Sequence, residues 1–257
     1  MTNILTTHYS VTAELHADTE QAKILAKRFS LPFSKHLDKA NHQLVFTNQH
    51  LEIRTPNLIN PIRIDFTEGK NAYRRSFGGG RGQPLAKAIG LKKGKMPTII
   101  DSTAGYGKDA FVLATLGSHV TLVERNPLLA ALLEDAIAKA NTKSSTKQIA
   151  RRMISIHSDA HQYLAELTPE ERPDVIYIDP MYPARDKSAL VKKEMQLLHQ
   201  LVGPDTDSRK LLDKALQTAK KRVVVKRPKL ADPITDYKPS TFVESKNTRY
   251  DIYLKIQ

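Results

Sequence analysis

One segment constrains the fold more than any other part of the chain: residues 97–127, PTIIDSTAGYGKDAFVLATLGSHVTLVERNP. Its apolar run at 98–100 predicts a short buried strand, residues 108–116 predict a helix that Gly117 ends, and residues 119–123 predict a second strand. A strand, a helix and a second strand in this order place the two strands parallel, through a right-handed crossover. The segment therefore predicts an α/β fold built on a parallel sheet.

The turn between the first strand and the helix is typical of a site where backbone meets a ligand. Gly105 and Gly107 tolerate positive φ and let the chain approach a bound molecule closely. Glu124 ends the second strand, at a spacing from which a carboxylate accepts hydrogen bonds from both hydroxyls of a ribose. The pattern predicts an adenosine-containing cofactor. The alternative is that the glycines only make a tight turn and that Glu124 is a solvated strand end.

Composition and sequence pattern predict a small lobe, a connecting segment and one larger domain. The chain has 257 residues, of which 40% are hydrophobic, which is enough for a sizeable core. Residues 1–70 predict a small N-terminal α+β lobe and residues 71–96 a basic, glycine-rich connection. Residues 97–257 predict the cofactor-binding domain, a doubly wound sheet with a terminal antiparallel hairpin.

The individual elements follow from hydrophobic periodicity, glycine, proline and helix-capping residues. For the lobe and the connection we expect a helix over 18–29, strands at 43–47, 51–54 and 62–66, and a short helix at 84–89. For the rest of the domain we expect helices over 128–140, 188–201 and 207–220, a loop at 141–148, strands at 153–156, 175–178 and 223–225, and a hairpin of 241–245 and 250–256.

The sequence also indicates a compartment. No apolar run approaches the roughly 18 residues that a membrane-spanning helix needs. The first residues lack the basic-then-apolar order of a signal peptide. The chain has no cysteine, which is compatible with a reducing environment. We therefore expect a cytoplasmic protein without a membrane partner.

The charge of the chain favours a polyanionic partner. The formal net charge is +13, and phosphates are attracted to such a surface with release of counterions, so nucleic acid is the leading candidate. Arg74, Arg75 and Arg81 surround a glycine triplet in the connecting segment and predict contacts with RNA. The alternative is a basic, flexible linker. The nine histidines show no metal-binding spacing, so we expect no metal site.

The carboxyl ends of parallel strands share one edge of a sheet, and doubly wound proteins bind their ligands there. Asp159 follows the strand predicted at 153–156 and is placed to accept a hydrogen bond from an adenine amino group. The backbone N–H of Ala160 is placed to donate to a ring nitrogen. The alternative is that Asp159 caps a helix that begins near Ala160.

The tetrapeptide Asp179-Pro180-Met181-Tyr182 is the sharpest chemical signal in the chain. It follows the strand predicted at 175–178. Asp179 and the Pro180 carbonyl suit the two N–H groups of an exocyclic amine on a planar base, and Tyr182 suits stacking on the ring. The lone pair of an aryl amine is delocalised and barely basic, so positioning matters more than a strong base. The tetrapeptide therefore predicts a catalytic site that needs no covalent nucleophile.

Long blocks of the sequence resemble a known family. They are RRSFGGGRG, DSTAGYGKDAFVLA, VERNPLLAALL, YIDPMYP, KSALVKKEMQLLHQLVGPD and KRVVVKRP. With the glycine turn, the acid that ends the second strand and the terminal hairpin, residues 84–257 resemble a class I S-adenosylmethionine-dependent methyltransferase with a Rossmann-like sheet. More narrowly, the blocks resemble the RsmJ family, which methylates N2 of a guanosine in 16S ribosomal RNA of the small subunit.

The resemblance implies a set of residues around S-adenosylmethionine: Lys108, Asp109, Glu124, Arg125, Asp159, Ala160 and Asp179. It also implies that the partner is the RNA or the assembled small subunit. The sequence departs from the wider superfamily at two positions. Thr103 stands where glycine is usual, which leaves the shape of the turn open, and Met181 stands where a second proline is common, which leaves the identity of the amine less constrained.

Two other functions remain open from the residues. Gly105-x-Gly107-x-x-Ala110 satisfies a dinucleotide fingerprint, which favours an NAD-dependent oxidoreductase. Asp109 opposes this alternative, because it would face a pyrophosphate in the first turn of the helix. A non-enzymatic RNA-binding factor for ribosome assembly is compatible with the charge, but retention of Asp179, Pro180 and Tyr182 argues for an enzyme.

Overall fold

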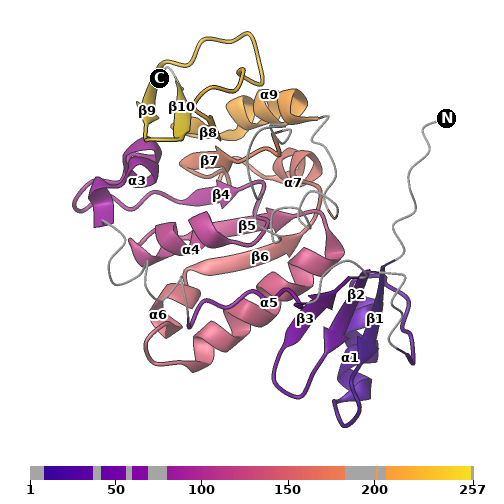
Figure 1. The fold of residues 1–257 in the computed structure, drawn as a ribbon. Helices are drawn as coiled ribbons and strands as arrows, with labels where there is room; N and C mark the ends of the chain where they lie inside the picture. The colour runs from indigo at the N-terminus through magenta and orange to yellow at the C-terminus, as the bar shows by residue number, and fades with distance from the viewer. Residues whose placement is uncertain are drawn as a thin grey trace, which may run out of the picture.

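The computed structural model describes residues 9–36, 42–55, 60–68, 80–182, 201 and 207–255. These residues form a large α/β domain and a small N-terminal lobe (Figure 1). None of the helices in these ranges is both long and apolar enough to cross a membrane.

A seven-stranded sheet organises the domain, in the order β6-β5-β4-β7-β8-β10-β9. Its strands are β4 (Ile99–Asp101), β5 (Val120–Glu124), β6 (Met153–His157), β7 (Val175–Ile178), β8 (Arg222–Pro228), β9 (Thr241–Glu244) and β10 (Thr248–Leu254). The strands from β6 to β8 in this order are parallel, whereas β10 runs antiparallel to β8 and to β9. The predicted doubly wound sheet with a terminal hairpin is confirmed.

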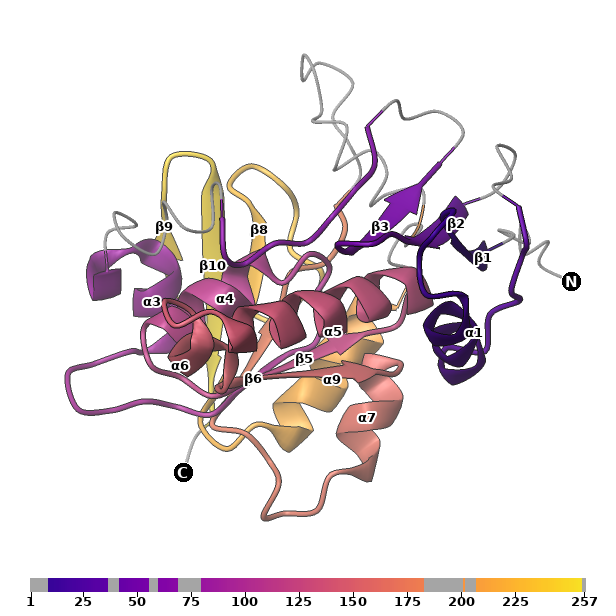
Figure 2. The same ribbon diagram turned by 90° about the horizontal axis from the view of Figure 1, so that it is seen from below.

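Helices cover both faces of this sheet, because successive strand residues point to opposite sides. One face packs against α3 (Pro84–Ile89), α4 (Lys108–Thr115), α5 (Pro127–Thr142) and α6 (Lys147–Ala150). The other packs against α7 (Ala160–Glu166) and α9 (Ser208–Thr218). Ile99 belongs to the first core and Ile100 to the second. Figure 2 shows the two helical layers on either side of the sheet.

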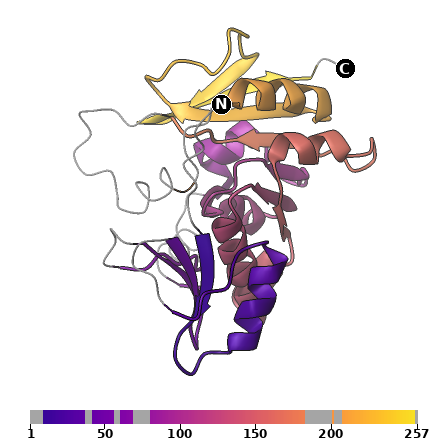
Figure 3. The same cartoon turned by 90° about the vertical axis from the view of Figure 1, so that its right-hand side faces the viewer.

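The N-terminal lobe is a three-stranded sheet with one helix. Its elements are β1 (Tyr9–Ala13), α1 (Thr19–Arg28), β2 (His42–Phe46) and β3 (Leu51–Arg54). The lobe lies beside α5 (Figure 3), where Arg28 forms an ion pair with Glu134 at 2.7 Å. The Asn126 side chain, at the start of α5, donates to the Tyr9 hydroxyl at 3.0 Å. Lobe and domain therefore share contacts close to the end of β5.

Two predicted features of the fold are wrong in detail, and one strand was not predicted. The segment 62–66 was predicted as a strand, but only Ile62 forms a bridge, with Ile53; its alternating apolar residues pack into the core instead of pairing along a ladder. The loop predicted at 141–148 contains the end of α5 and the start of α6, where buried Thr146 bonds the Ala140 carbonyl. Strand β1 was not predicted. The helix predicted at 188–201 lies almost wholly outside the described residues.

Candidate active site

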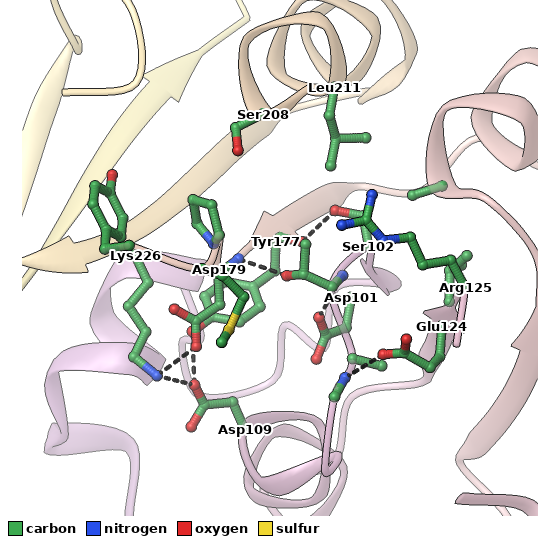
Figure 4. Close-up of a pocket in the computed structure, with 18 of the residues that line it drawn as sticks. Asp101, Ser102, Asp109, Glu124, Arg125, Tyr177, Asp179, Ser208, Leu211 and Lys226 are labelled. Carbon is green, nitrogen blue, oxygen red and sulfur yellow. Dashed lines mark hydrogen bonds and ion pairs between the residues drawn. The ribbon is translucent and has the colours of Figure 1, made fainter. Parts of the chain in front are cut away.

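A pocket of about 460 Å³ opens at the carboxyl ends of the parallel strands (Figure 4). The structure brings together in its lining all the residues predicted for cofactor and catalysis: Gly105, Lys108, Asp109, Glu124, Arg125, Asp159, Ala160, Asp179, Pro180 and Tyr182. Arg81 is exposed and does not line the pocket. Arg74 and Arg75 lie outside the described residues.

The glycine turn and Glu124 form one hydrogen-bonded unit. Gly105 has φ of 51° and Gly107 has φ of 66°. A Cβ at Gly107 would lie 2.7 Å from a methyl group of Leu133, so the turn also needs glycine for packing. Glu124 is 5% exposed, and its carboxylate accepts from the backbone N–H of Gly105 and of Asn126, both at 2.8 Å. The carboxylate therefore holds the turn in place as well as facing the pocket.

Thr103, where the sequence departs from the usual glycine, joins this turn to the tetrapeptide at 179–182. Its hydroxyl accepts from the Asp179 backbone N–H at 2.6 Å, and its own N–H donates to an Asp101 oxygen at 3.2 Å. A glycine here would lack the hydroxyl. Thr103 thus fixes the backbone of Asp179. Met181, the second departure, is partly buried against the core.

An ammonium group links two of the predicted acids. Lys226, on β8, lies 2.8 Å from Asp109 and 2.8 Å from Asp179, as the dashed lines of Figure 4 show. The Tyr177 hydroxyl donates to the same Asp109 oxygen at 2.7 Å. Lys226 directly follows the strand predicted at 223–225, and the sequence pattern assigns no role to it. The sequence feature that indicates a role for Lys226 is its position at the carboxyl end of a parallel strand, at the same edge of the sheet as Glu124 and Asp179.

Burial and charge set the protonation of this cluster. Burial by itself lowers the pKa of Lys226, but Asp179 and Asp109 outweigh it and the pKa is raised above its ordinary value. Burial, with Asp109 adding to it, raises the pKa of Asp101 well above the usual range of a carboxyl. The same two causes raise the pKa of Tyr177. Burial therefore favours the neutral forms of Asp101 and Tyr177 beside the charged residues.

We expect Asp101→Asn to stabilise the protein increasingly as the pH rises. A folded-state pKa above the unfolded one favours folding below the unfolded pKa, and this contribution is lost as the pH climbs through the folded pKa. Asn cannot ionise and keeps an oxygen for the Thr103 N–H. The difference in Tm between variant and wild type should therefore grow as the pH rises above the ordinary carboxyl pKa of about 4. A difference that is constant with pH would show that Asp101 does not titrate in this way.

The opposite end of the pocket is lined by Arg125, which follows β5, and by residues of α7 and α9. Asp159 caps α7, with its carboxylate accepting from the Gln162 N–H at 3.0 Å, as the alternative interpretation proposed. Arg125 reaches toward Asp207 at 3.4 Å, and Leu211 of α9 supplies an apolar side chain. The binding of adenine by Asp159 and Ala160 stays a prediction, and the structure shows that Asp159 also caps α7.

Pro180 is buried and Tyr182 partly buried next to Asp179. The Tyr182 hydroxyl is buried and has no hydrogen-bond partner among the described residues. Burial raises the pKa of Tyr182, so the ring is neutral at physiological pH. The stacking role of the Tyr182 ring stays a prediction.

The fold and the site define an S-adenosylmethionine-dependent methyltransferase, and the comparisons with known proteins agree. A family model described as "Putative SAM-dependent methyltransferase" matches residues 24–255. A solved SAM-dependent methyltransferase from Neisseria gonorrhoeae is 35% identical, with a TM-score of 0.78 and 95% of each chain covered.

Relatives with a more specific name are similar over almost the whole chain. "Ribosomal RNA small subunit methyltransferase J" of Chromobacterium violaceum is 46% identical over 240 residues, 93% of each chain, and that of Aeromonas salmonicida is 49% identical over 238 residues, 91% of this chain and 92% of its own. The chain belongs to the ribosomal RNA small subunit methyltransferase J family. Neither alternative, the NAD-dependent oxidoreductase or the non-enzymatic assembly factor, agrees with this membership.

Proposed function

We propose that this protein transfers a methyl group from S-adenosylmethionine to the exocyclic N2 of a guanosine in 16S ribosomal RNA. The observation that carries the proposal is the position of Asp179, which is fixed by Thr103 and Lys226 in the same pocket as the glycine turn. The names of the relatives indicate the small-subunit RNA. The resemblance of the tetrapeptide to amino-methyltransferases indicates the amine.

The donor groups of the pocket fit S-adenosylmethionine, which supplies a methyl group on a positively charged sulfonium. Each Glu124 oxygen takes one backbone N–H, and a carboxylate oxygen has two lone-pair sites, so the pair can also accept from a ribose diol. Arg125 and Leu211 offer a planar cation and an apolar surface for an adenine ring. The volume of about 460 Å³ lies within the range of small-molecule sites.

At the other end of the pocket, the chain's own groups suit an aromatic amine. Asp179 and the Pro180 carbonyl are placed to accept its two N–H bonds, which orients the nitrogen lone pair toward the methyl group. The carboxylate stabilises positive charge that develops on the nitrogen, and the proton is then lost to solvent or to Asp179. The described residues include no cluster of three or more metal-binding side chains.

A guanine amino group within a duplex cannot reach such a pocket. The target base must therefore be unpaired or flipped out, and we place it against Tyr182. The partner is the 16S RNA, naked or assembled into the small subunit, and we place the reaction in the cytoplasm, where ribosomal subunits mature.

The basic connecting segment is expected to hold the RNA and not the cofactor. Replacing Arg74, Arg75 and Arg81 together with Gln should weaken RNA binding and flatten its dependence on salt by up to about three units of logarithmic slope. Cofactor affinity should not change, because Arg81 lies outside the pocket. A matched control removes three exposed cations near α6, at the other end of the strands: Lys143, Lys147 and Arg151. Equal loss in both triple variants, or loss of cofactor binding alone, would refute the assignment.

Transfer of a labelled methyl group tests the proposed substrate. We expect label in 16S RNA when the purified protein is given small-subunit RNA or particles from cells that lack its activity, and no label in large subunits. Comparing naked RNA with assembled subunits identifies the physiological form. Label confined to large-subunit RNA or to protein would contradict the proposal.

A further inference from the structure

The two acids nearest the proposed amine site share a single ammonium group. Lys226 comes from β8, Asp109 from the first turn of α4, and Asp179 from the end of β7. The Lys226 nitrogen lies 2.8 Å from one oxygen of each carboxylate, and the lysine side chain is 26% exposed. Figure 4 shows the side chain reaching from its strand toward both acids. Three separate elements of the fold are thus tied together at one point of the pocket.

Hydrogen bonds hold Asp179 in one orientation, and the Lys226 ammonium also balances negative charge around it. Its backbone N–H is bound by the Thr103 hydroxyl, and its side chain is bound by Lys226. Asp109, which anchors the ammonium from the other side, is itself fixed by the Tyr177 hydroxyl. A charged hydrogen bond of this length is strong, because both partners are partly removed from water. The lysine therefore restrains the carboxylate expected to receive the amine.

Two carboxylates this close together need a positive charge between them to stay ionised, and Lys226 supplies it. The titratable groups around Lys226, Asp109 and Asp179 are Asp101 on β4, Tyr177 on β7, Tyr182 just beyond β7, and Tyr250 on β10, which pairs with Lys226. Burial favours the neutral forms of Asp101 and Tyr177. Two carboxylates and one ammonium then leave one net negative charge, which suits a sulfonium and an amine that becomes cationic. Without the ammonium, two carboxylates would repel each other and one would bind a proton.

We propose that Lys226 is a positioning residue for methyl transfer, which keeps Asp179 ionised and oriented toward the substrate amine by sharing its ammonium with Asp109. This inference rests on the proposed function, because it assumes that Asp179 receives the amine. It assigns to Asp109 the task of anchoring Lys226. It also explains why a lysine lies near a site that binds cationic groups. The lysine balances the charge of one carboxylate, so the cluster keeps one net negative charge.

The pH dependence of turnover tests the inference. In Lys226→Met, measured with saturating cofactor and RNA, the acid limb of the kcat profile should move to higher pH by about one to two units, since a neighbouring opposite charge shifts a carboxylate by about that much. On the acid limb, kcat should fall about tenfold for each unit of this shift, and the loss should disappear as the pH rises. Lys226→Arg keeps the charge and should keep the wild-type profile. The matched control is Lys221→Met, which removes an exposed lysine paired with Asp174 at the other end of β8.

A double variant keeps the test decisive if the single variant is unstable. Lys226→Met with Asp109→Asn removes the ammonium and one carboxylate together, so the net charge of the cluster is restored. Its acid limb should move back toward that of the wild type. Unfolding temperatures of all variants show whether a loss of kcat reflects a loss of folded protein.

The outcomes separate this inference from the proposed function. If the wild type methylates 16S RNA and Lys226→Met keeps an unshifted profile, the inference is wrong and the proposed function stands. The inference would also be wrong if kcat fell by the same factor at every pH and the double variant did not restore it. Lys226 would then have only a structural role. If the wild type transfers no methyl group to 16S RNA, the proposed function has failed before the variants are compared.

Discussion

Replacing Asp179 with Asn is expected to lower kcat by about 10²–10³-fold, the effect typical of removing one preorganised electrostatic group. Asn keeps the shape of the side chain but offers a neutral acceptor to an amine that becomes positively charged. Lys226 loses one of its two partners in this variant, which adds to the effect. The measurement is single-turnover methyl transfer at saturating S-adenosylmethionine, with RNA and cofactor affinities determined in parallel.

The control for this variant is Asp236→Asn, which changes an exposed aspartate paired with Arg209 away from the pocket. It should leave kcat and both affinities unchanged. An Asp179→Asn protein that turns over near the wild-type rate under saturation would show that the Asp179 carboxylate is not catalytic. A change confined to cofactor affinity would place Asp179 in cofactor binding alone.

Replacing Glu124 with Ala is expected to weaken the binding of S-adenosylmethionine by about 10²-fold or more. Two hydrogen bonds from a ribose to a charged acceptor contribute about 1.5–3 kcal/mol each. The structure adds a second reason, because Ala also leaves the Gly105 and Asn126 N–H groups without their carboxylate partner. Calorimetric titration of S-adenosylhomocysteine measures the loss. Glu166→Ala, which changes an exposed acid outside the pocket, is the matched control.

A ligand lacking the ribose hydroxyls separates the two reasons. The wild type should lose affinity for a dideoxyribose analogue of S-adenosylhomocysteine, whereas Glu124→Ala, which has already lost the acceptor, should discriminate little. Equal discrimination by both proteins would assign the effect of Glu124 to the turn and move the ribose site elsewhere.

Local patterns were sufficient to predict the sheet because most of its parallel strands are short runs of buried apolar residues. The segment containing β4, α4 and β5 shows this most clearly, and its edges agree with the structure within about one residue. The hydrophobic pattern gave a wrong strand where apolar residues are buried without pairing to a neighbouring strand. Residues 62–66 alternate because their apolar side chains enter the core, and alternation alone cannot show that a neighbouring strand is absent. Strand β1 is short and partly polar, and it is recognisable only through its parallel pairing with β2.

The site was predictable as far as strand order places residues at one edge. Glu124, Asp159 and Asp179 follow separate strands, and the rule for parallel sheets was enough to bring them into one pocket. The hydrogen bonds among them were not predictable. Lys226 contacts Asp109 and Asp179 across long separations in the chain, and its role depends on side-chain reach that no sequence period encodes. Thr103 appeared as a departure from a motif, whereas the structure shows it bound to the Asp179 backbone.

The nucleoside that carries the methyl group tests the central claim most directly. Small-subunit RNA methylated by the wild-type protein with isotopically labelled S-adenosylmethionine is digested to nucleosides and separated by chromatography with mass detection. The account predicts a single labelled product, N2-methylguanosine, that is strongly reduced with Asp179→Asn. Label on a ribose, on a ring nitrogen or on the amino group of adenosine or cytidine would contradict the assignment of Asp179 and Pro180 to the guanine amine.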